Sequence, residues 1–247
     1  MEEIILRGSG ISKSFDGIKV LENIDIDIPK GSFTVIMGSS GAGKSTLLYA
    51  LSGMDNPDSG QIEYKNKSIT ELPEKQMAKL RSEEFGFIFQ QIHLVSSLTL
   101  FENVTVAGCV RKSNTADVIK RAEKLFEKMK LSGVKDKLPS EVSGGEGQRA
   151  AVARAVIKDP GIVFADEPTG ALNRSNTDGV LDLLSGIHDE GQTVLMVTHD
   201  MHCALRGNRI IYLDDGHIKG ELSLGEFSPD DLTRQQRLSD WLACQGW

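Results

Sequence analysis

Residues 33–45 read FTVIMGSSGAGKS, and this stretch decides the fold. Its first five residues form a short, mostly apolar run between Gly31 and Gly38, which is typical of a buried strand in a parallel sheet. The remaining residues satisfy the pattern GxxxxGK followed by Ser or Thr. Residues 44–51 have a helical pattern, and Gly53 marks its predicted end. This order of strand, glycine-rich turn and helix predicts a phosphate-binding loop.

The glycine-rich turn has the composition of a cradle for nucleotide phosphates. Its glycines let the backbone curl so that N–H groups face inward, and the positive end of the following helix dipole adds to the attraction. Lys44 is expected to reach the β- and γ-phosphates, and Ser45 to contribute an oxygen to Mg²⁺. The predicted nucleotide-binding residues of this turn are Gly38, Ser39, Ser40, Gly41, Ala42, Gly43, Lys44, Ser45 and Thr46.

Two more buried strands are predicted at residues 161–165 (GIVFA) and 193–197 (TVLMV), with a helical pattern at residues 173–190 between them. Strand, helix and strand in this order predict a parallel α/β core. The residues after the first of these strands would reach the carboxyl edge of the sheet, beside the cradle. There Asp166 would hold Mg²⁺ through its water shell, and Glu167 would polarise a water that attacks the γ-phosphate.

The middle of the chain differs from this core. Residues 92–159 contain helical patterns at 116–131 and 145–158 without a convincing strand pair, which predicts a helical subdomain inserted into the sheet domain. A hairpin is predicted at residues 209–222, where two apolar runs flank Asp-Asp-Gly. The predicted boundaries are one domain at 1–227, with its core at about 1–91 and 160–227 and its helical subdomain at 92–159, and a helical tail at 228–247.

Composition excludes several classes of protein. The chain has 247 residues, a net charge of −7 and a pI near 5.3, which argues against sequence-independent nucleic-acid binding. No apolar run approaches the roughly 18–20 residues of a membrane span, and the first residues, MEEIILRGSG, do not resemble a secretory signal. Three cysteines without a CxxC pair indicate thiols in a reducing compartment. We therefore expect a cytoplasmic globular protein.

Residues 142–149 read VSGGEGQR and open a predicted helix. Ser143 and the N–H groups of Gly144 and Gly145 would form a second anion site at its N-terminus. The order of features along the chain resembles the nucleotide-binding subunit of ATP-binding cassette (ABC) transporters. In both, the phosphate cradle is followed by a loop with a glutamine, this signature segment, the strand that ends in carboxylates and a histidine. The chain resembles that subunit from residue 4 to residue 222.

The resemblance implies an α/β fold of the P-loop ATPase type. This fold has a mostly parallel core sheet, an N-terminal antiparallel β subdomain and the inserted helical subdomain. The resemblance also implies ATP hydrolysis with Mg²⁺. In this family the signature does not reach its own cradle, so two copies would pair head to tail and enclose two ATP molecules. Closure would then depend on the γ-phosphate, and hydrolysis would release it.

Further residue roles are implied by the resemblance. Phe15 resembles the aromatic residue that stacks on adenine, and His199 is expected to bridge Glu167 and the γ-phosphate. Gln90 resembles the loop glutamine that touches Mg²⁺ and senses the γ-phosphate; Gln91 is adjacent, but Gln90 directly follows the strand-like run before it. The implied sets are Glu167, His199, Lys44 and Gln90 for catalysis, Ser45, Gln90 and Asp166 for the metal, and Ser143, Gly144, Gly145 and Glu146 for the partner's γ-phosphate.

Three positions depart from the commonest family pattern. Glu146 stands where many members have Gln, and Gly147 replaces a polar residue and loosens the start of the helix. Asn173 stands where the loop usually ends in Asp, which puts the communication between the two active sites in doubt but not the binding of ATP.

Several phrases resemble the macrolide-export and lipoprotein-release branch, among them residues 87–91 (FIFQQ), 98–104 (LTLFENV) and 165–173 (ADEPTGALN). This likeness implies an FtsX-type permease as partner and the export or extraction of an antimicrobial peptide, a drug or a lipid-linked substrate. The subunit would lie on the inner face of the membrane, would touch it only through the permease and would bind no nucleic acid. An ATP-gated sensing or signalling complex is the open alternative to a pump.

The sequence leaves the role of two surface segments open, with two interpretations for each. Residues 92–104 would dock the coupling element of the permease, or their leucines would only cap the core of the helical subdomain. The tail around Trp241 and Trp247 would pack on its own domain or contact a partner.

Overall fold

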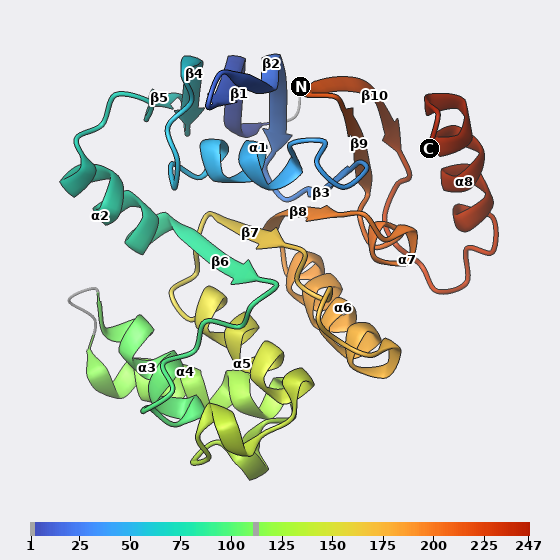
Figure 1. Ribbon diagram of the computed structural model, residues 1–247. Coiled ribbons are helices and arrows are strands. Elements are labelled where there is room, and N and C mark those ends of the chain that lie inside the picture. Colours follow the sequence, from blue (N-terminus) through green and yellow to red (C-terminus); the bar gives the residue numbers. More distant parts are fainter. Residues whose placement is uncertain (1–2, 111–113) are drawn as a thin grey trace.

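The computed structural model describes residues 3–110 and 114–247, so positions 1–2 and 111–113 of the predicted domains lie outside the described residues. The first three described elements are strands, and strands and helices alternate from α5 to β9 (Figure 1). The elements are β1 (Ile4–Phe15), β2 (Ile18–Pro29), β3 (Phe33–Met37), α1 (Lys44–Leu51), β4 (Ser59–Tyr64), β5 (Lys67–Ser68), α2 (Glu74–Glu84), β6 (Phe85–Phe89), α3 (Leu100–Cys109), α4 (Thr115–Lys128), η1 (Ser132–Val134), η2 (Pro139–Glu141), α5 (Gly144–Val156), β7 (Ile162–Asp166), α6 (Arg174–Asp189), β8 (Thr193–Thr198), α7 (Met201–Ala204), β9 (Arg209–Asp214), β10 (His217–Ser223) and α8 (Arg234–Gln245).

The core sheet has the strand order β10-β9-β3-β8-β7-β6 within the described chain. Strands β9, β3, β8, β7 and β6 run parallel, and β10 pairs antiparallel with β9 in the predicted hairpin. Every residue of β3, β7 and β8 is buried, as expected for strands covered on both faces. The segments after β3, β8, β7 and β6 therefore all leave from one edge of the sheet.

A second, antiparallel sheet has the order β2-β1-β4-β5 in the described residues. Helix α1 lies between the two sheets, and its Leu47 and Leu48 belong to a buried cluster with Ile36 of the core sheet and Ile62 of the antiparallel sheet (Figure 1). The predicted combination of a mostly parallel core sheet and an N-terminal antiparallel sheet is confirmed.

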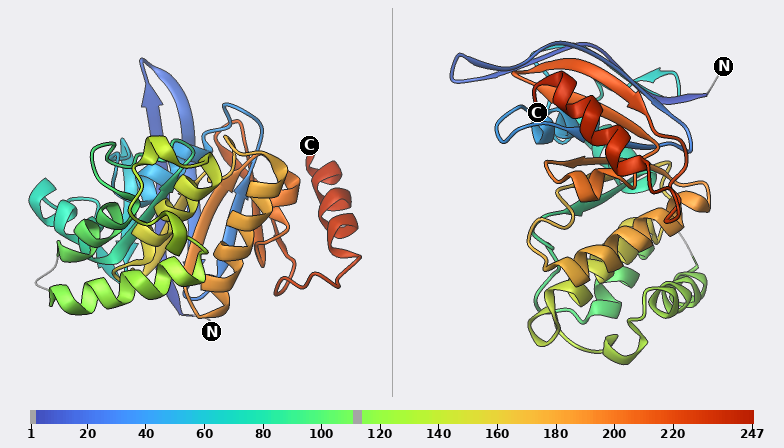
Figure 2. Two further views of the ribbon diagram at one scale, coloured as in Figure 1. Left: turned by 90° about the horizontal axis from the view of Figure 1, so that it is seen from below. Right: turned by 90° about the vertical axis from the view of Figure 1, so that its right-hand side faces the viewer.

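Helices α3, α4 and α5 gather at one side of the core sheet, next to α6 (Figures 1 and 2). Their apolar faces share one buried cluster that includes Val104, Phe126 and Val152, together with Val163 of β7. Both long helices predicted in this region are present, with ends shifted by one to three residues. Helix α3 begins with a capping box between Thr99 and Glu102, which the periodicity alone did not locate.

Helix α8 packs against β10, beside the core sheet and away from α3–α5 (Figure 2). Leu238 and Leu242 are buried, and the guanidinium of the fully buried Arg234 donates hydrogen bonds to the carbonyl oxygens of Leu205 and Leu224. These bonds fix the start of the helix on its own domain. No helix in the described part of the chain is long and apolar enough to cross a membrane.

Candidate nucleotide-binding site

A cavity of about 630 Å³ opens at the carboxyl edge of the core sheet. The turn between β3 and α1 forms one wall, and the residues that follow β6, β7 and β8 form another. The lining residues are Val20, Ser39, Ser40, Gly41, Gly43, Lys44, Ser45, Thr46, Gln90, Glu167, His199 and Trp247. The fold thus brings Gln90, Glu167 and His199, which are far apart in the sequence, to the predicted phosphate cradle.

The cradle is shaped by close backbone contacts. Gly43 has φ +97°, a backbone conformation that favours glycine. A Cβ atom there would also lie 2.8 Å from the carbonyl oxygen of Val20, so both the conformation and the space require glycine. The Lys44 ammonium donates hydrogen bonds to the carbonyl oxygens of Gly38, at 2.9 Å, and Ser39, at 2.8 Å. Burial lowers the pKa of Lys44, while the nearby carboxylates oppose this shift. The lysine is therefore held on the turn whose bound phosphates it would meet.

Asp166 sits between two hydroxyl groups of helix α1. The Ser45 hydroxyl donates to one carboxylate oxygen at 2.7 Å, and the Tyr49 hydroxyl donates to the other at 2.5 Å. Burial and this hydrogen bond raise the pKa of Tyr49, so the phenol stays a donor. Tyr49 was missed in the sequence, although its position four residues after Ser45 places both on one helix face.

These oxygens fit a magnesium ion. Mg²⁺ prefers oxygen ligands and uses one or two carboxylates together with substrate phosphates and water. Ser45 and Asp166 supply a hydroxyl and a carboxylate in contact, and Gln90 adds an amide oxygen to the same cavity. Among the described residues no group of three or more His, Cys, Asp or Glu side chains could hold a metal. A metal held here would therefore need the phosphates of its nucleotide.

Glu167 and His199 form a pair over the cavity. The Nδ1 atom of His199 lies 2.8 Å from Oε1 of Glu167, whose side chain is 16 % exposed, whereas that of His199 is 62 % exposed. The backbone of Glu167 is left-handed, with φ +46°, and its N–H donates to the carbonyl oxygen of Val197 at 3.1 Å. A non-glycine residue in this conformation is strained and is often found at functional sites.

Gln90 lines the cavity and Gln91 does not, which agrees with the choice of Gln90 for the loop glutamine. Its amide packs against the backbone of Gly170, where a Cβ atom would lie 2.9 Å from Nε2. Gly170 is therefore needed for the close approach of this loop to the residues that follow Glu167.

The signature residues lie apart from this cavity. Ser143 is the N-cap of α5, and its N–H and hydroxyl donate to the Glu146 carboxylate at 2.8 and 2.7 Å. These hydrogen bonds lower the pKa of Glu146. The structure therefore does not bring Ser143, Gly144, Gly145 and Glu146 to the cradle of the same chain. Phe15 is also outside the cavity wall: it ends β1, is 48 % exposed and has the Lys13 ammonium 5.2 Å from its ring.

Two of the unusual positions have structural roles. A Cβ atom on Gly147 would lie 3.0 Å from Cδ1 of Ile92, so the glycine lets α5 approach the segment after Gln90 closely. Asn173 is the N-cap of α6, and its side chain accepts a hydrogen bond from the N–H of Asn176 at 3.0 Å.

One further residue connects the signature helix α5 to the loops that line the cavity. Gln148 of α5 is 1 % exposed, and its amide donates to the carbonyl oxygens of Phe89, at 3.0 Å, and Pro168, at 2.7 Å. Phe89 precedes Gln90 and Pro168 follows Glu167. The helix that carries Ser143 is thus bonded directly to the loops that carry Gln90 and Glu167, a link that the sequence pattern did not predict.

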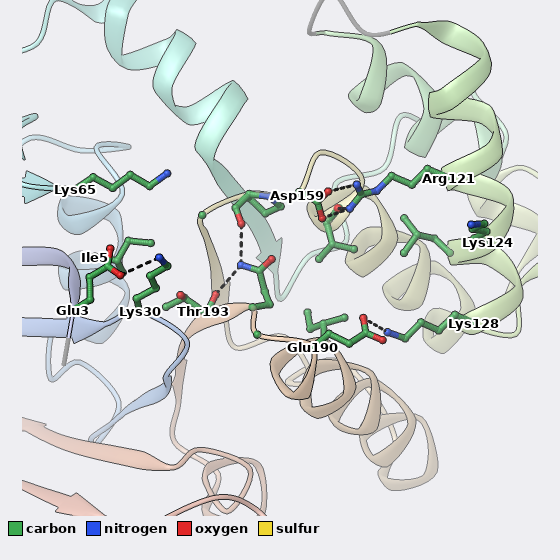
Figure 3. Close-up of a pocket in the computed structure, with 17 residues that line it drawn as sticks. Glu3, Ile5, Lys30, Lys65, Arg121, Lys124, Lys128, Asp159, Glu190 and Thr193 are labelled. Carbon is green, nitrogen blue, oxygen red and sulfur yellow. Dashed lines mark hydrogen bonds and ion pairs between the residues drawn. The ribbon is translucent and has the colours of Figure 1, made fainter.

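A second cavity lies at the opposite, amino edge of the core sheet and contains none of the predicted site residues (Figure 3). Ion pairs cross it: Arg121 of α4 contacts Asp159, and Lys128 of α4 contacts Glu190 at 2.7 Å (Figure 3). These pairs join the helical region to the core around the strands β7 and β8.

Cradle, signature and carboxylate strand on this fold define an ABC ATPase cassette. Residues 21–170 match the family model described as ABC transporter, and the chain belongs to this family.

Among curated proteins, the chain is 38 % identical over 248 residues to a bacitracin export ATP-binding protein, BceA, of Halalkalibacterium halodurans, with 98 % of this chain and 96 % of that protein aligned. It is 38 % identical to the LolD ATP-binding protein of a lipoprotein-releasing system of Aquifex aeolicus, over 89 % of this chain and 98 % of LolD. It is 43 % identical to a macrolide export ATP-binding/permease protein, MacB, of Mannheimia succiniciproducens over 81 % of this chain, but the aligned part is only 31 % of MacB.

Solved cassettes have the same fold. A dimeric post-hydrolysis state of the cassette MJ0796 bound to ADP and Pi matches with a TM-score of 0.82 and 34 % identity, over 90 % of this chain and all of that one. A dimeric structure of MJ0796, described as a bacterial ABC transporter cassette, matches with a TM-score of 0.83 and 35 % identity over the same shares.

Proposed function

We propose that two copies of this chain bind two molecules of MgATP between them, hydrolyse them and thereby drive an FtsX-type permease on the inner face of a membrane. One observation carries the proposal: the cavity collects the cradle, Gln90, Glu167 and His199, and its Ser45 is hydrogen-bonded to Asp166. The signature Ser143 lies elsewhere on the same chain. The site therefore has the groups for hydrolysis and lacks its second phosphate-binding wall.

The first step is the binding of the triphosphate. Backbone N–H groups of the turn and the Lys44 ammonium neutralise the β- and γ-phosphates. Ser45, Asp166 and Gln90 would hold Mg²⁺, which neutralises charge on the β- and γ-phosphate oxygens when it is bound. On binding, Lys44 exchanges its two carbonyl acceptors for phosphate oxygens, a change favoured because the ammonium is partly desolvated.

Hydrolysis is assigned to the pair of Glu167 and His199. The Glu167 carboxylate orients a water molecule and accepts its proton as the oxygen attacks the γ-phosphorus, and ADP leaves with the electron pair of the broken P–O bond. The imidazole of His199 holds the Glu167 carboxylate, with 2.8 Å between Nδ1 and Oε1, and would meet the γ-phosphate of a bound nucleotide. The strained backbone at Glu167 fixes the direction of its side chain.

The second copy supplies the missing wall. Ser143 is exposed at the N-terminus of α5, where its hydroxyl and the N–H groups of the first turn can meet a γ-phosphate presented by another chain. The solved relative MJ0796 is a dimer in two of its structures. A head-to-tail dimer of this chain would complete two identical sites.

A surface beside the glutamine loop suits the permease. A cavity of about 480 Å³ between α2, β6, α3 and α5 is lined by Met54, Phe87, Phe89 and His93. Asn103 fixes the adjoining loop, because its side chain accepts a hydrogen bond from the N–H of Val95 at 2.7 Å and donates to three carbonyl oxygens of residues 95–99.

We assign both of its predicted roles to this loop. Leu100 is fully buried and Leu94 packs against the core, so part of the segment caps the helical region. Val95 is 52 % exposed, and His93, two residues earlier in the same loop, lines the cavity. A rigid loop that presents an apolar side chain next to an aromatic cavity, and that begins at the γ-phosphate-sensing Gln90, suits a short helix of a permease.

The names of the relatives suggest the cargo. MacB is a macrolide exporter, BceA a bacitracin exporter and LolD part of a lipoprotein-releasing system. We infer that the permease of this chain exports or extracts an antimicrobial peptide, a drug or a lipid-linked substrate.

Glu167→Gln tests the proposal. We expect turnover to fall by roughly 10²–10⁴-fold because the general base is lost, while ATP is still bound and holds a dimer that light scattering detects. Adding Ser143→Arg should abolish this dimer, because the arginine blocks the signature, and Glu71→Gln, an exposed carboxylate outside the cavity, is the matched control. Near-normal turnover of Glu167→Gln, or a dimer that forms in spite of Ser143→Arg, would refute the assignment.

A further inference from the structure

We propose that Tyr49 is a positioning residue of the nucleotide site, which holds the Asp166 carboxylate in the orientation that favours Mg²⁺ over Ca²⁺. This inference rests on the proposed function, since the ion concerned is the one that accompanies the bound triphosphate. Tyr49 is not among the described residues that line the cavity, and its hydroxyl reaches the site only through Asp166.

The core sheet fixes the backbone of Asp166. This residue ends β7 and pairs in register with Phe89 of β6 on one side and Val197 of β8 on the other. It is 8 % exposed, so water has little access to its carboxylate. The freedom that remains is the rotation of the carboxylate about its side-chain bonds, and this rotation decides which oxygen faces the ion.

Two hydroxyl groups of helix α1 restrict this rotation. The Ser45 hydroxyl donates to Oδ1 at 2.7 Å, and the Tyr49 hydroxyl donates to Oδ2 at 2.5 Å. Ser45 lines the cavity, so Oδ1 is the oxygen next to the proposed ion, whereas Oδ2 is held by a residue outside the lining. Binding of one ion by both oxygens would require the carboxylate to turn and would break the hydrogen bond from Tyr49.

Tyr49 is itself held in place. Its carbonyl oxygen accepts hydrogen bonds from the N–H groups of Met54, at 2.9 Å, and Asp55, at 3.2 Å, which fix the chain at the end of α1. Its ring packs against the buried cluster that contains Leu47 and Leu48. A hydroxyl on a ring that is already ordered can orient the carboxylate without a further loss of conformational entropy.

The orientation of the carboxylate matters because the two ions differ in their ligands. Mg²⁺ demands nearly octahedral geometry at about 2.0–2.1 Å and uses one or two carboxylates together with phosphates and water. Ca²⁺ accepts roughly six to eight oxygens at about 2.3–2.6 Å, and a carboxylate can supply both of its oxygens. An Asp166 that offers only Oδ1 therefore suits Mg²⁺, and one that is free to turn suits Ca²⁺ better.

The affinity for a nucleotide with each ion tests this role. Isothermal titration calorimetry measures the Kd for AMP-PNP, a non-hydrolysable ATP analogue, in Mg²⁺, in Ca²⁺ and in EDTA. Tyr49→Phe removes the hydroxyl and keeps the ring. We expect its Kd for MgAMP-PNP to rise on the order of 10- to 100-fold, as for other partners that orient a metal ligand. Its Kd for CaAMP-PNP should rise less, and its Kd in EDTA should equal that of the wild type.

Tyr64→Phe is the matched control. The Tyr64 hydroxyl also donates to a carboxylate, that of Glu84, at 2.9 Å, and Tyr64 is buried. Neither residue belongs to the described lining of the cavity. This variant therefore loses a hydrogen bond of the same kind outside the nucleotide site, and all three of its Kd values should equal those of the wild type.

The other outcomes overturn the inference. An unchanged Kd of Tyr49→Phe for MgAMP-PNP, or an equal rise with Mg²⁺ and Ca²⁺, would exclude this role of Tyr49 and leave the nucleotide site standing. A rise in EDTA as large as in Mg²⁺ would show that Tyr49 supports the cradle instead of the ion. A wild-type chain that binds AMP-PNP no better with Mg²⁺ than in EDTA would refute the metal site, and with it this part of the proposed function.

The EPR spectrum of Mn²⁺ gives a second readout, which is independent of affinity. Mn²⁺ accepts the same octahedral set of oxygen ligands as Mg²⁺, and its spectrum depends on their arrangement. With MnAMP-PNP bound, Tyr49→Phe should give a spectrum different from that of the wild type, and Tyr64→Phe should reproduce the wild-type spectrum. Identical spectra of the wild type and Tyr49→Phe would show that the hydroxyl does not orient Asp166 toward the ion.

Discussion

Replacing Gln148 by methionine should destabilise the protein, because this side chain bonds one buried and one partly buried carbonyl group from separate loops. Its amide donates to Phe89 at 3.0 Å and to Pro168 at 2.7 Å, and its own Oε1 is buried and has no partner among the described residues. Methionine has a similar length and flexibility, so it fills the space without a cavity. The change therefore measures the hydrogen bonds rather than the packing.

The magnitude follows from counting the polar groups. A buried carbonyl left without a donor costs about 1–3 kcal/mol, and two of them cost about 2–6 kcal/mol. Removing the unpaired Oε1 returns about 1–3 kcal/mol, since that atom no longer has to be desolvated. We expect a net loss of about 2 kcal/mol, which lowers the Tm of a chain of this size by roughly 4–8 °C.

Thermal and urea unfolding followed by circular dichroism give the assay. Gln76→Met, at an exposed position of α2, is the matched control and should lie within about 0.5 kcal/mol of the wild type. ATPase activity measured well below the Tm should also fall for Gln148→Met, because Gln90 and Glu167 sit next to the two freed carbonyl groups. A Gln148→Met chain with unchanged Tm and unchanged activity would show that these bonds hold neither loop.

Two further predictions concern titrating groups. The hydrogen bonds from Ser143 lower the pKa of Glu146 in the folded chain, so their stabilisation is present above the ordinary value of 4.5 and is lost as the pH falls through the lowered value. The Tm should therefore drop more between pH 7 and 3.5 for the wild type than for Glu146→Gln, which keeps a neutral capping box. Equal drops in Tm would contradict this account. Burial raises the pKa of Cys203 to about 11, while Cys109 and Cys244 are exposed. A thiol reagent at pH 8 should therefore modify Cys109 and Cys244 quickly and Cys203 only after unfolding. Equally fast modification of all three cysteines would contradict this prediction.

The core sheet could be predicted because its strands are short, apolar and bounded by turns. Residues 33–37 were predicted as a strand and form β3 with the same bounds. Strand β1 was missed, although the antiparallel sheet was expected from the family resemblance. Its sequence contains Gly8 and Gly10, and its pairing with β2 shifts register at several points, so no regular alternation marks it. Helix α2 buries only Met77, and its periodic signal is correspondingly weak.

The residues of the candidate site also differ in whether the sequence could predict them. The cradle and the carboxylates form contiguous motifs, so the sequence alone located Lys44 and Glu167. Tyr49 lies outside the quoted motifs, and Gln148 lies in the signature segment but had no role assigned to it there. Their roles come from tertiary contacts with Asp166 and with two loop carbonyls. Only Tyr49 had a sequence signal, namely its helical spacing from Ser45.

The contacts of α5 explain how the proposed dimer could report the state of both sites. Ser143, at the start of this helix, would touch the γ-phosphate held by the other chain, and Gln148, little more than one turn later, bonds the loops of Gln90 and Glu167 in its own chain. A helix is stiff over so short a distance. In the proposed dimer, movement of Ser143 on loss of the partner's phosphate would therefore displace Gln148, and with it the residues proposed to hold the chain's own γ-phosphate. The close contact of Gly147 with Ile92 would carry the same displacement toward the surface on which the permease is proposed to dock. Coupling of this kind needs no charge at Asn173, which here caps α6 through its amide oxygen.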